Sequence, residues 1–174
     1  ADFVTRDITE KVYKENYNYR DFAILYRTNA QSRLFEEKFV VSNIPYKIVG
    51  GVNFYARREI KDLLCYLKTI DNARDDLAVR RIINVPKRGI GAASLNKVQI
   101  FADANGMSFY DALKKAEEIP GLGRAAGKIR PFVTFIQAMR SKLDLIGLTD
   151  LLNEIIETTG YVEELELEGT EEAA

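Results

Sequence analysis

A short stretch near the middle of the chain, NVPKRGIGAASLNKV, combines glycines, cations and a hydroxyl in a spacing that suits phosphate binding. Gly89 and Gly91 enclose one apolar residue, Ile90, and Lys87 and Arg88 come directly before them. Glycine lets a turn adopt positive φ and lets a backbone approach a phosphate closely. A helix that begins after such a turn offers its first N–H groups and the positive end of its dipole to an anion. We therefore expect Ile90 to anchor the turn while the groups around it face a phosphate.

The flanking sequence predicts a helix on each side of this turn, which is the pattern of a helix-hairpin-helix element. The segment VRRIINV supplies the first helix and AASLNKVQIF supplies the second. Ser94 lies in the first turn of the second helix and Lys97 lies one turn further along. Contacts of this kind reach the backbone of duplex DNA and carry no sequence preference. The alternative is an ordinary connection between helices, with the cations solvated.

A second stretch, PGLGRAAGKI at residues 120–129, repeats the alternation of glycines with an apolar residue. Arg124 and Lys128 follow it, but the preceding segment KKAEEI is less basic. We therefore predict a plain turn between helices at this second position.

The net charge of −1 conceals an asymmetry along the chain. Residues 1–142 carry all 25 basic side chains and 16 of the acidic ones, whereas residues 143–174 carry ten acids and no base. The first part can meet a polyanion and the acidic end cannot. We expect the acidic end to be a solvated helix face.

The composition argues against several classes of enzyme. The chain has no histidine and a single cysteine, Cys65, which excludes catalysis by Ser-His or Cys-His pairs and disfavours a zinc site. It contains no G-x-x-x-x-G-K-[ST] sequence to cradle a nucleotide, and no cluster of carboxylates suited to a two-metal nuclease. The sequence also has no apolar run of the roughly 20 residues that a membrane span needs. These features predict a cytoplasmic protein without a complete active site or a metal site, and with Cys65 packed as a small apolar side chain.

The predicted elements divide the chain into two parts. Residues 1–50 predict the order helix, strand, helix, strand, which is an α/β pattern. The four signals are, in order, the helical periodicity over 3–16, the apolar run DFAILYRT, a helix over 29–43 and the segment IPYKIVGG. Two strands make a poor sheet by themselves, which suggests a piece of something larger. Residues 51–174 predict only helices, and we expect Pro131 to break or bend one of them.

Three separated stretches together resemble superfamily 1A DNA helicases of the UvrD/PcrA/Rep type, and most closely the PcrA branch. They are AILYRTNAQSR at 23–33, GGVNFYARREIKDLLCYLK at 50–68 and RIINVPKRGIGAASL at 81–95. The resemblance extends over essentially the whole chain, with the stretches in the expected order. It implies that residues 1–50 are part of the RecA-like subdomain 2A and that residues 51–174 are most of the all-α subdomain 2B.

The resemblance also implies a function. The full-length parent would be a 3′-to-5′ DNA helicase of DNA repair or replication that hydrolyses ATP with Mg²⁺, whereas this fragment lacks the Walker motifs and is expected to be inactive alone. Its partners would be single-stranded and duplex DNA and the remaining subdomains 1A, 1B and the rest of 2A.

The site residues follow from the same resemblance, position by position. Those matching the single-stranded DNA surface of 2A are Arg27, Asn29, Ser32 and Arg33. Those matching the duplex-gripping element of 2B are Lys87, Arg88, Gly89, Ile90, Gly91 and Ser94, with Lys97 nearby. Those expected at the hinge between the subdomains are Gly50, Gly51, Phe54, Arg57 and Glu59, and a further duplex-contacting loop would begin at residues 168–170.

Two other interpretations stay open at this point. The chain can be a stand-alone, non-enzymatic helix-hairpin-helix module that binds DNA without serving a motor. It can also be a protein-interaction module whose acidic end docks a basic partner.

Overall fold

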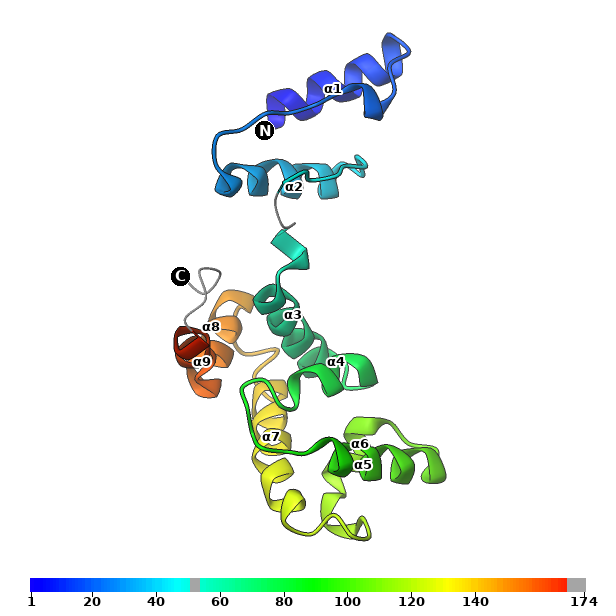
Figure 1. Ribbon diagram of the computed structural model, residues 1–174, viewed down its shortest axis with the longest axis vertical. Coiled ribbons are helices and arrows are strands. Elements are labelled where there is room, and N and C mark those ends of the chain that lie inside the picture. The colour runs from blue at the N-terminus through cyan, green and yellow to red at the C-terminus, as the bar shows by residue number, and fades with distance from the viewer. Residues whose placement is uncertain (51–53, 169–174) are drawn as a thin grey trace. The chain divides into compact units, whose positions relative to one another are not determined.

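The computed structural model describes residues 1–50 and 54–168 (Figure 1). The chain forms two compact units, Ala1–Lys61 and Asp62–Ala174, which we call the N-terminal and C-terminal units. Among the described residues, no helix is long and apolar enough to cross a membrane.

The N-terminal unit packs two helices around a small core. Its elements are α1 (Asp2–Lys14), α2 (Ser32–Val41) and the short 3-10 turns η1 (Tyr19–Asp21), η2 (Asn29–Gln31) and η3 (Phe54–Ala56). Ile8 of α1, Phe39 of α2 and Ile44 are buried together, and less buried rings such as Tyr46 pack around them. Both helices fall where the apolar spacing predicts them.

The prediction of two strands in this unit was wrong. Residues 22–26 and 44–48 have no regular secondary structure, and the described part of the chain contains no strand at all. A strand is defined by its ladder to a neighbour, so an apolar run without a partner stays irregular. Both runs line a hollow of about 760 Å³, together with α2. The α/β fold expected for residues 1–50 is therefore absent from this structure.

The C-terminal unit is helical, as expected for residues after Gly51. Its elements are α3 (Arg58–Asp71, beginning in the N-terminal unit), α4 (Asp76–Ile82), α5 (Ala92–Asn105), α6 (Phe109–Lys114), η4 (Ala116–Glu118), α7 (Arg124–Arg140), α8 (Leu148–Thr159) and α9 (Tyr161–Glu168). Ser108 caps α6, because its hydroxyl accepts the Asp111 N–H. Gly106 and Gly160 end α5 and α8 in the left-handed conformation.

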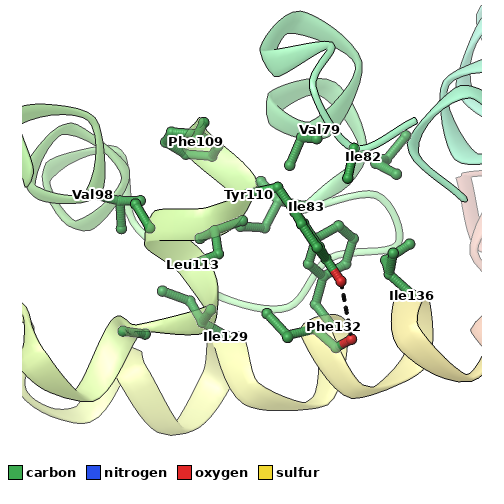
Figure 2. Close-up of a cluster of buried hydrophobic side chains, with 14 of the residues drawn as sticks. Val79, Ile82, Ile83, Val98, Phe109, Tyr110, Leu113, Ile129, Phe132 and Ile136 are labelled. Carbon is green, nitrogen blue, oxygen red and sulfur yellow. Dashed lines mark hydrogen bonds between the residues drawn. The ribbon is translucent and has the colours of Figure 1, made fainter. Parts of the chain in front are cut away.

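The long helix α7 organises the core of this unit. Figure 2 shows Ile129, Phe132 and Ile136 on one face of α7, pointing toward side chains contributed by α4, α5 and α6. All three are at most 1% exposed. The helix runs through Pro131 to Arg140, so of the two outcomes expected at this residue, a break or a bend, the break does not occur. Buried contacts on both sides of the proline hold the helix together despite the backbone hydrogen bond that proline cannot make.

The lone cysteine packs at the edge of this core. Cys65 of α3 is a free thiol and is half-buried against the core. Burial raises the pKa of this thiol, which keeps it protonated and unreactive at neutral pH.

Candidate nucleic-acid interface

The glycine-rich turn connects α4 to α5 and is anchored in the core. Helix α4 ends at Ile82 and α5 begins at Ala92, so the connection is longer than the tight turn that the sequence predicts. Gly89 has φ +67°, a conformation that favours glycine, whereas Gly91 has φ −73° and serves as the N-cap of α5. Ile90 is 2% exposed. The expected anchor is therefore present, and the need for positive φ applies to Gly89 alone.

Asn84 fixes the shape of the turn, a role that the sequence analysis missed. Its side-chain oxygen accepts the N–H groups of Arg88 and Ile90, at 3.1 and 3.2 Å. Its side-chain nitrogen donates to the Ile90 carbonyl at 2.7 Å. Asparagine side chains commonly bond to the backbone of nearby turns, so its place just before the motif was an available signal.

Arg88 points into the protein and holds the end of α4. One terminal nitrogen of its guanidinium, Nη1, donates to the carbonyls of Ile82, Ile83 and Pro86 at 3.0–3.2 Å. These bonds satisfy carbonyls that a helix C-terminus leaves without intrahelical partners, and the positive charge suits that end of the dipole. The guanidinium also lies 5.2 Å from the centroid of the Phe132 ring.

Tyr66 of α3 completes the support beneath the turn. Its hydroxyl accepts a bond from Arg88 Nη2 at 2.7 Å and donates to the Val85 carbonyl at 2.6 Å. Burial raises the pKa of this hydroxyl, and the positive charge of Arg88 opposes that rise only in part. Tyr66 therefore stays protonated, and its hydroxyl continues to donate a hydrogen bond to the Val85 carbonyl of the loop.

The other cations of the motif lie at the surface. Lys87 is exposed, and its backbone N–H donates to Glu164 Oε1 of α9 at 2.9 Å. Lys97 is exposed on α5, and its ammonium donates to the Gly121 carbonyl at 2.5 Å. Ser94 is half-buried in the first turn of α5.

The second glycine turn lies against the first. Gly121 has φ +71° and Leu122 is 5% exposed, so this turn is also bent at glycine and anchored by an apolar residue. Lys128 of α7 donates to the Gly89 carbonyl at 2.8 Å, the counterpart of the bond from Lys97 to Gly121. A carbonyl of each turn thus accepts a hydrogen bond from a lysine on the helix that follows the other turn.

The residues expected to contact single-stranded DNA occupy different environments. Arg27 is exposed beside η2, and its backbone N–H donates to the Gln31 side chain at 3.0 Å. The side chain of Asn29 lies outside the described part of the structure. Ser32 is buried and donates to Glu36 Oε1 at 2.9 Å. Arg33 bonds Glu37 at 2.9 Å, and its guanidinium lies 4.5 Å from the centroid of the Phe54 ring.

Glu36 is the residue of this region that the sequence analysis missed. It is 2% exposed, and its second oxygen accepts the Phe54 N–H at 3.0 Å. The carboxylate therefore ties α2 to η3. The serine four residues before it on a predicted helix was a weak signal for such a pair.

The expected hinge residues are only partly described. Gly50 has φ +79°, and Gly51 and residues 169–170 lie outside the described residues. The Phe54 ring packs edge-on against Tyr55, with centroids 5.3 Å apart. Arg57 and Glu59 approach to 4.0 Å, a weak surface pair.

A buried carboxylate joins three helices of the C-terminal unit. Asp62 of α3 is 2% exposed, and its two oxygens accept Arg81 Nε at 2.6 Å and the Tyr161 hydroxyl at 2.7 Å. This contact holds α9 to α3 and α4. It thereby helps to place Glu164 beside the glycine turn.

The chain was also compared in sequence with known proteins. A family model for the UvrD-like helicase C-terminal domain matches residues 1–121. The chain therefore belongs to the UvrD-like helicase C-terminal domain family.

Similar proteins share the sequence nearly end to end. The chain is 45% identical over 173 residues to an ATP-dependent DNA helicase PcrA from Staphylococcus aureus (strain Mu50 / ATCC 700699). The matched region covers 99% of this chain and 24% of that protein. The chain is 42% identical over 168 residues to a PcrA from Staphylococcus epidermidis (strain ATCC 12228 / FDA PCI 1200), covering 97% and 23%. The chain thus spans about a quarter of the length of these relatives, and the resemblance drawn from its three motifs is confirmed.

Proposed function

We propose that this chain supplies DNA contacts to a 3′-to-5′ DNA helicase, and that residues 84–98 grip the phosphates of duplex DNA. The observation that carries the proposal is the anchored turn. Ile90 is buried and Gly89 is at positive φ, while residues 91–93 at the start of α5 are exposed. The first N–H groups of a helix have no intrahelical partners, and Gly91 places no side chain over them. A phosphate can therefore approach the start of α5 closely.

The cations divide into two roles. Lys87 and Lys97 are exposed on either side of the turn, so their charge is available to a polyanion. Arg88 is a positioning residue, because its guanidinium is engaged with the end of α4. We propose that Arg88 acts on DNA only through the shape of the loop, with Asn84 and Tyr66 in the same capacity.

The N-terminal unit contributes the single-stranded contacts in this account. Arg27 and Arg33 are both exposed, but Arg33 is paired with Glu37, so we propose that the Arg27 side chain contacts a phosphate. Ser32 and Arg33 are held by Glu36 and Glu37, and we propose that they set the geometry of the surface. Asn29 stays a proposed contact on the resemblance alone.

The motor itself lies outside this chain. The relatives are named ATP-dependent DNA helicases, and the chain spans 24% of the S. aureus protein. The sequence has no P-loop, so we propose that ATP and Mg²⁺ bind elsewhere in a longer parent, with subdomains 1A, 1B and the rest of 2A. We expect this chain alone to show no ATPase activity.

Fluorescence anisotropy with labelled DNA tests the duplex grip. We expect the chain to bind a 16-base-pair duplex in a salt-dependent way, and Lys87→Gln to weaken that binding and flatten its salt dependence by about one unit of slope. Lys68→Gln, which removes one exposed cation from α3, is the matched control. Absence of salt-dependent duplex binding by the wild-type chain would refute the proposal.

A further inference from the structure

The C-terminal unit has a hollow of about 330 Å³ that the function proposed above does not use. We call it the α6 hollow, because α6 and the serine that caps it lie between the other two segments that line it, in sequence. Its lining residues lie within 72–74, the link that follows α3, within 108–114, and within 137–140, the last turn of α7. The volume is at the lower end of the roughly 300–1,000 Å³ typical of small-molecule sites. The α6 hollow therefore has room for a small ligand.

Buried contacts hold the base of the α6 hollow in place. Ala73 and Tyr110 are 7% and 4% exposed, and the Tyr110 hydroxyl donates to the Val133 carbonyl at 3.4 Å. Burial raises the pKa of this hydroxyl to about 12, so it stays neutral at physiological pH. The Ser108 hydroxyl accepts the Asp111 N–H at 3.1 Å and donates to the Asp111 carboxylate at 2.8 Å. The hollow is thus shaped before a ligand arrives, which lowers the cost of ordering on binding.

The lining of the α6 hollow carries an excess of positive charge. Three cations, Arg74, Lys114 and Arg140, line it with one acid, Asp111. The Asp111 carboxylate pairs with the Lys114 ammonium at 2.6 Å, and this bond holds the pKa of the carboxyl below its usual value. The guanidinium groups of Arg74 and Arg140 make no hydrogen bond or ion pair with any residue that the structure describes. Their two charges are therefore left for a ligand.

The two carboxylates that follow Arg74 in the sequence are engaged elsewhere. Asp75 Oδ1 accepts the Ala78 N–H at 3.0 Å, at the start of α4. Asp76 Oδ1 accepts the Phe109 N–H at 2.9 Å, at the start of α6. Each thus satisfies a helix N-terminus, and neither lines the α6 hollow.

We propose that the α6 hollow binds a small molecule that carries a phosphate group, held between Arg74 and Arg140. A guanidinium presents a planar fork of N–H donors that matches phosphate oxygens, and the two charges match a phosphate dianion. Gln137 lies on the same wall as Arg140, and its side-chain amide makes no hydrogen bond with a described residue. This amide adds an uncharged donor for the ligand. The inference does not depend on the duplex grip.

Isothermal titration calorimetry of the 174-residue chain with inorganic pyrophosphate, at an ionic strength held constant with sodium chloride, tests the site. We expect saturable binding of one pyrophosphate per chain. Arg74→Gln and Arg140→Gln should each weaken the affinity by about tenfold or more, because each removes charge-assisted hydrogen bonds. Arg140→Lys keeps the charge but loses the fork, so its affinity should lie between those of the wild type and Arg140→Gln. Arg124→Gln, the same change at the exposed first residue of α7, is the matched control and should bind as the wild type does.

Amide NMR of the wild-type chain tests the location without any substitution. Pyrophosphate should shift the amide signals of residues 72–74, 108–114 and 137–140. Melting curves followed by circular dichroism check the folding of each variant. Both replaced arginines are exposed, so we expect the midpoints to stay unchanged.

Three results would overturn the inference. The first is the absence of pyrophosphate binding. The second is binding that folded Arg74→Gln and Arg140→Gln leave unchanged, and the third is a set of NMR shifts outside the α6 hollow. If pyrophosphate does not bind and the same two variants weaken duplex binding in the anisotropy assay, these arginines contact nucleic acid instead.

Discussion

The two units of this chain differ in how completely they bury their apolar side chains. The C-terminal unit has a core contributed by α3 through α8, with many side chains fully buried. Among its described residues, the N-terminal unit has three buried apolar residues, Ile8, Phe39 and Ile44, and two apolar runs beside a hollow. Hydrophobic stabilisation scales with the apolar area removed from water, so the C-terminal unit should dominate the stability of the chain. The same helices that build its core also hold the glycine turns.

Truncation of core side chains should show the largest difference in stability effect between the two units. Phe132 is 1% exposed in the core of the C-terminal unit, and Phe132→Ala should lower the free energy of unfolding by about 3–5 kcal/mol. Phe39→Ala should have a clearly smaller effect on the main transition, because its cluster is small and lies in the other unit. Urea unfolding followed by circular dichroism measures both. Equal shifts of the main transition would show that the two units unfold as one.

Removal of the buried Asp62 carboxylate should cause the next largest loss in the free energy of unfolding. Asp62→Ala removes the acceptor for Arg81 and Tyr161, and we expect a loss of about 1.5–3 kcal/mol in the free energy of unfolding. Asp7→Ala, which removes an exposed pair with Lys11, should have a clearly smaller effect, because water screens such a pair. A similar small loss for both variants would mean that α9 is not held through Asp62.

Alkaline pH should weaken the C-terminal unit through Tyr110. Burial raises the pKa of this hydroxyl to about 12, above its ordinary value of 10.0. The neutral form is thus favoured in the folded state, so its contribution is fully present below pH 10 and is lost as pH rises toward 12. Tyr110→Phe should reduce the loss of stability between pH 10 and 12, measured as the urea midpoint. Tyr13→Phe, at a side chain 80% exposed, should leave that loss as it is in the wild type.

Glycines in the same backbone conformation should have different effects in the two units. Gly89→Ala should destabilise the main transition by about 1–2 kcal/mol, since alanine is strained at φ +67° and Lys128 Nζ lies 3.1 Å from the added carbon. Gly50→Ala has the same strain at φ +79° but lies in the N-terminal unit, so the main transition should not shift. Gly127→Ala, inside α7 with open space around it, should stabilise by about 0.5–1 kcal/mol. If Gly89→Ala had no effect, the turn would not be fixed as described.

The helices were predictable because their signals are local. Apolar spacing predicted α1 and α2 and predicted that the residues after 51 form only helices, and the capping pair Ser108 and Asp111 is a local signal for the start of α6. The strands were not, because an apolar run such as residues 22–26 becomes a strand only beside a partner. Pro131 does not break α7, since tertiary packing of the helix outweighs the local cost of proline.

The candidate site was predictable in its chain position and not in its contacts. The glycines and Ile90 predicted an anchored turn. Gly89 has the positive φ expected of such a turn, and Ile90 has the expected burial. The inward direction of Arg88 and the lysine exchange between the turns depend on contacts across 22–39 residues. No local pattern specifies such contacts.

The central claim is that phosphate meets the backbone at the start of α5, and amide NMR of the chain during titration with a 16-base-pair duplex tests it most directly. We predict that the amide signals of Gly91, Ala92 and Ala93 shift with added duplex and return as salt is raised. Shifts confined to other parts of the chain, with these three amides unchanged, would contradict the account.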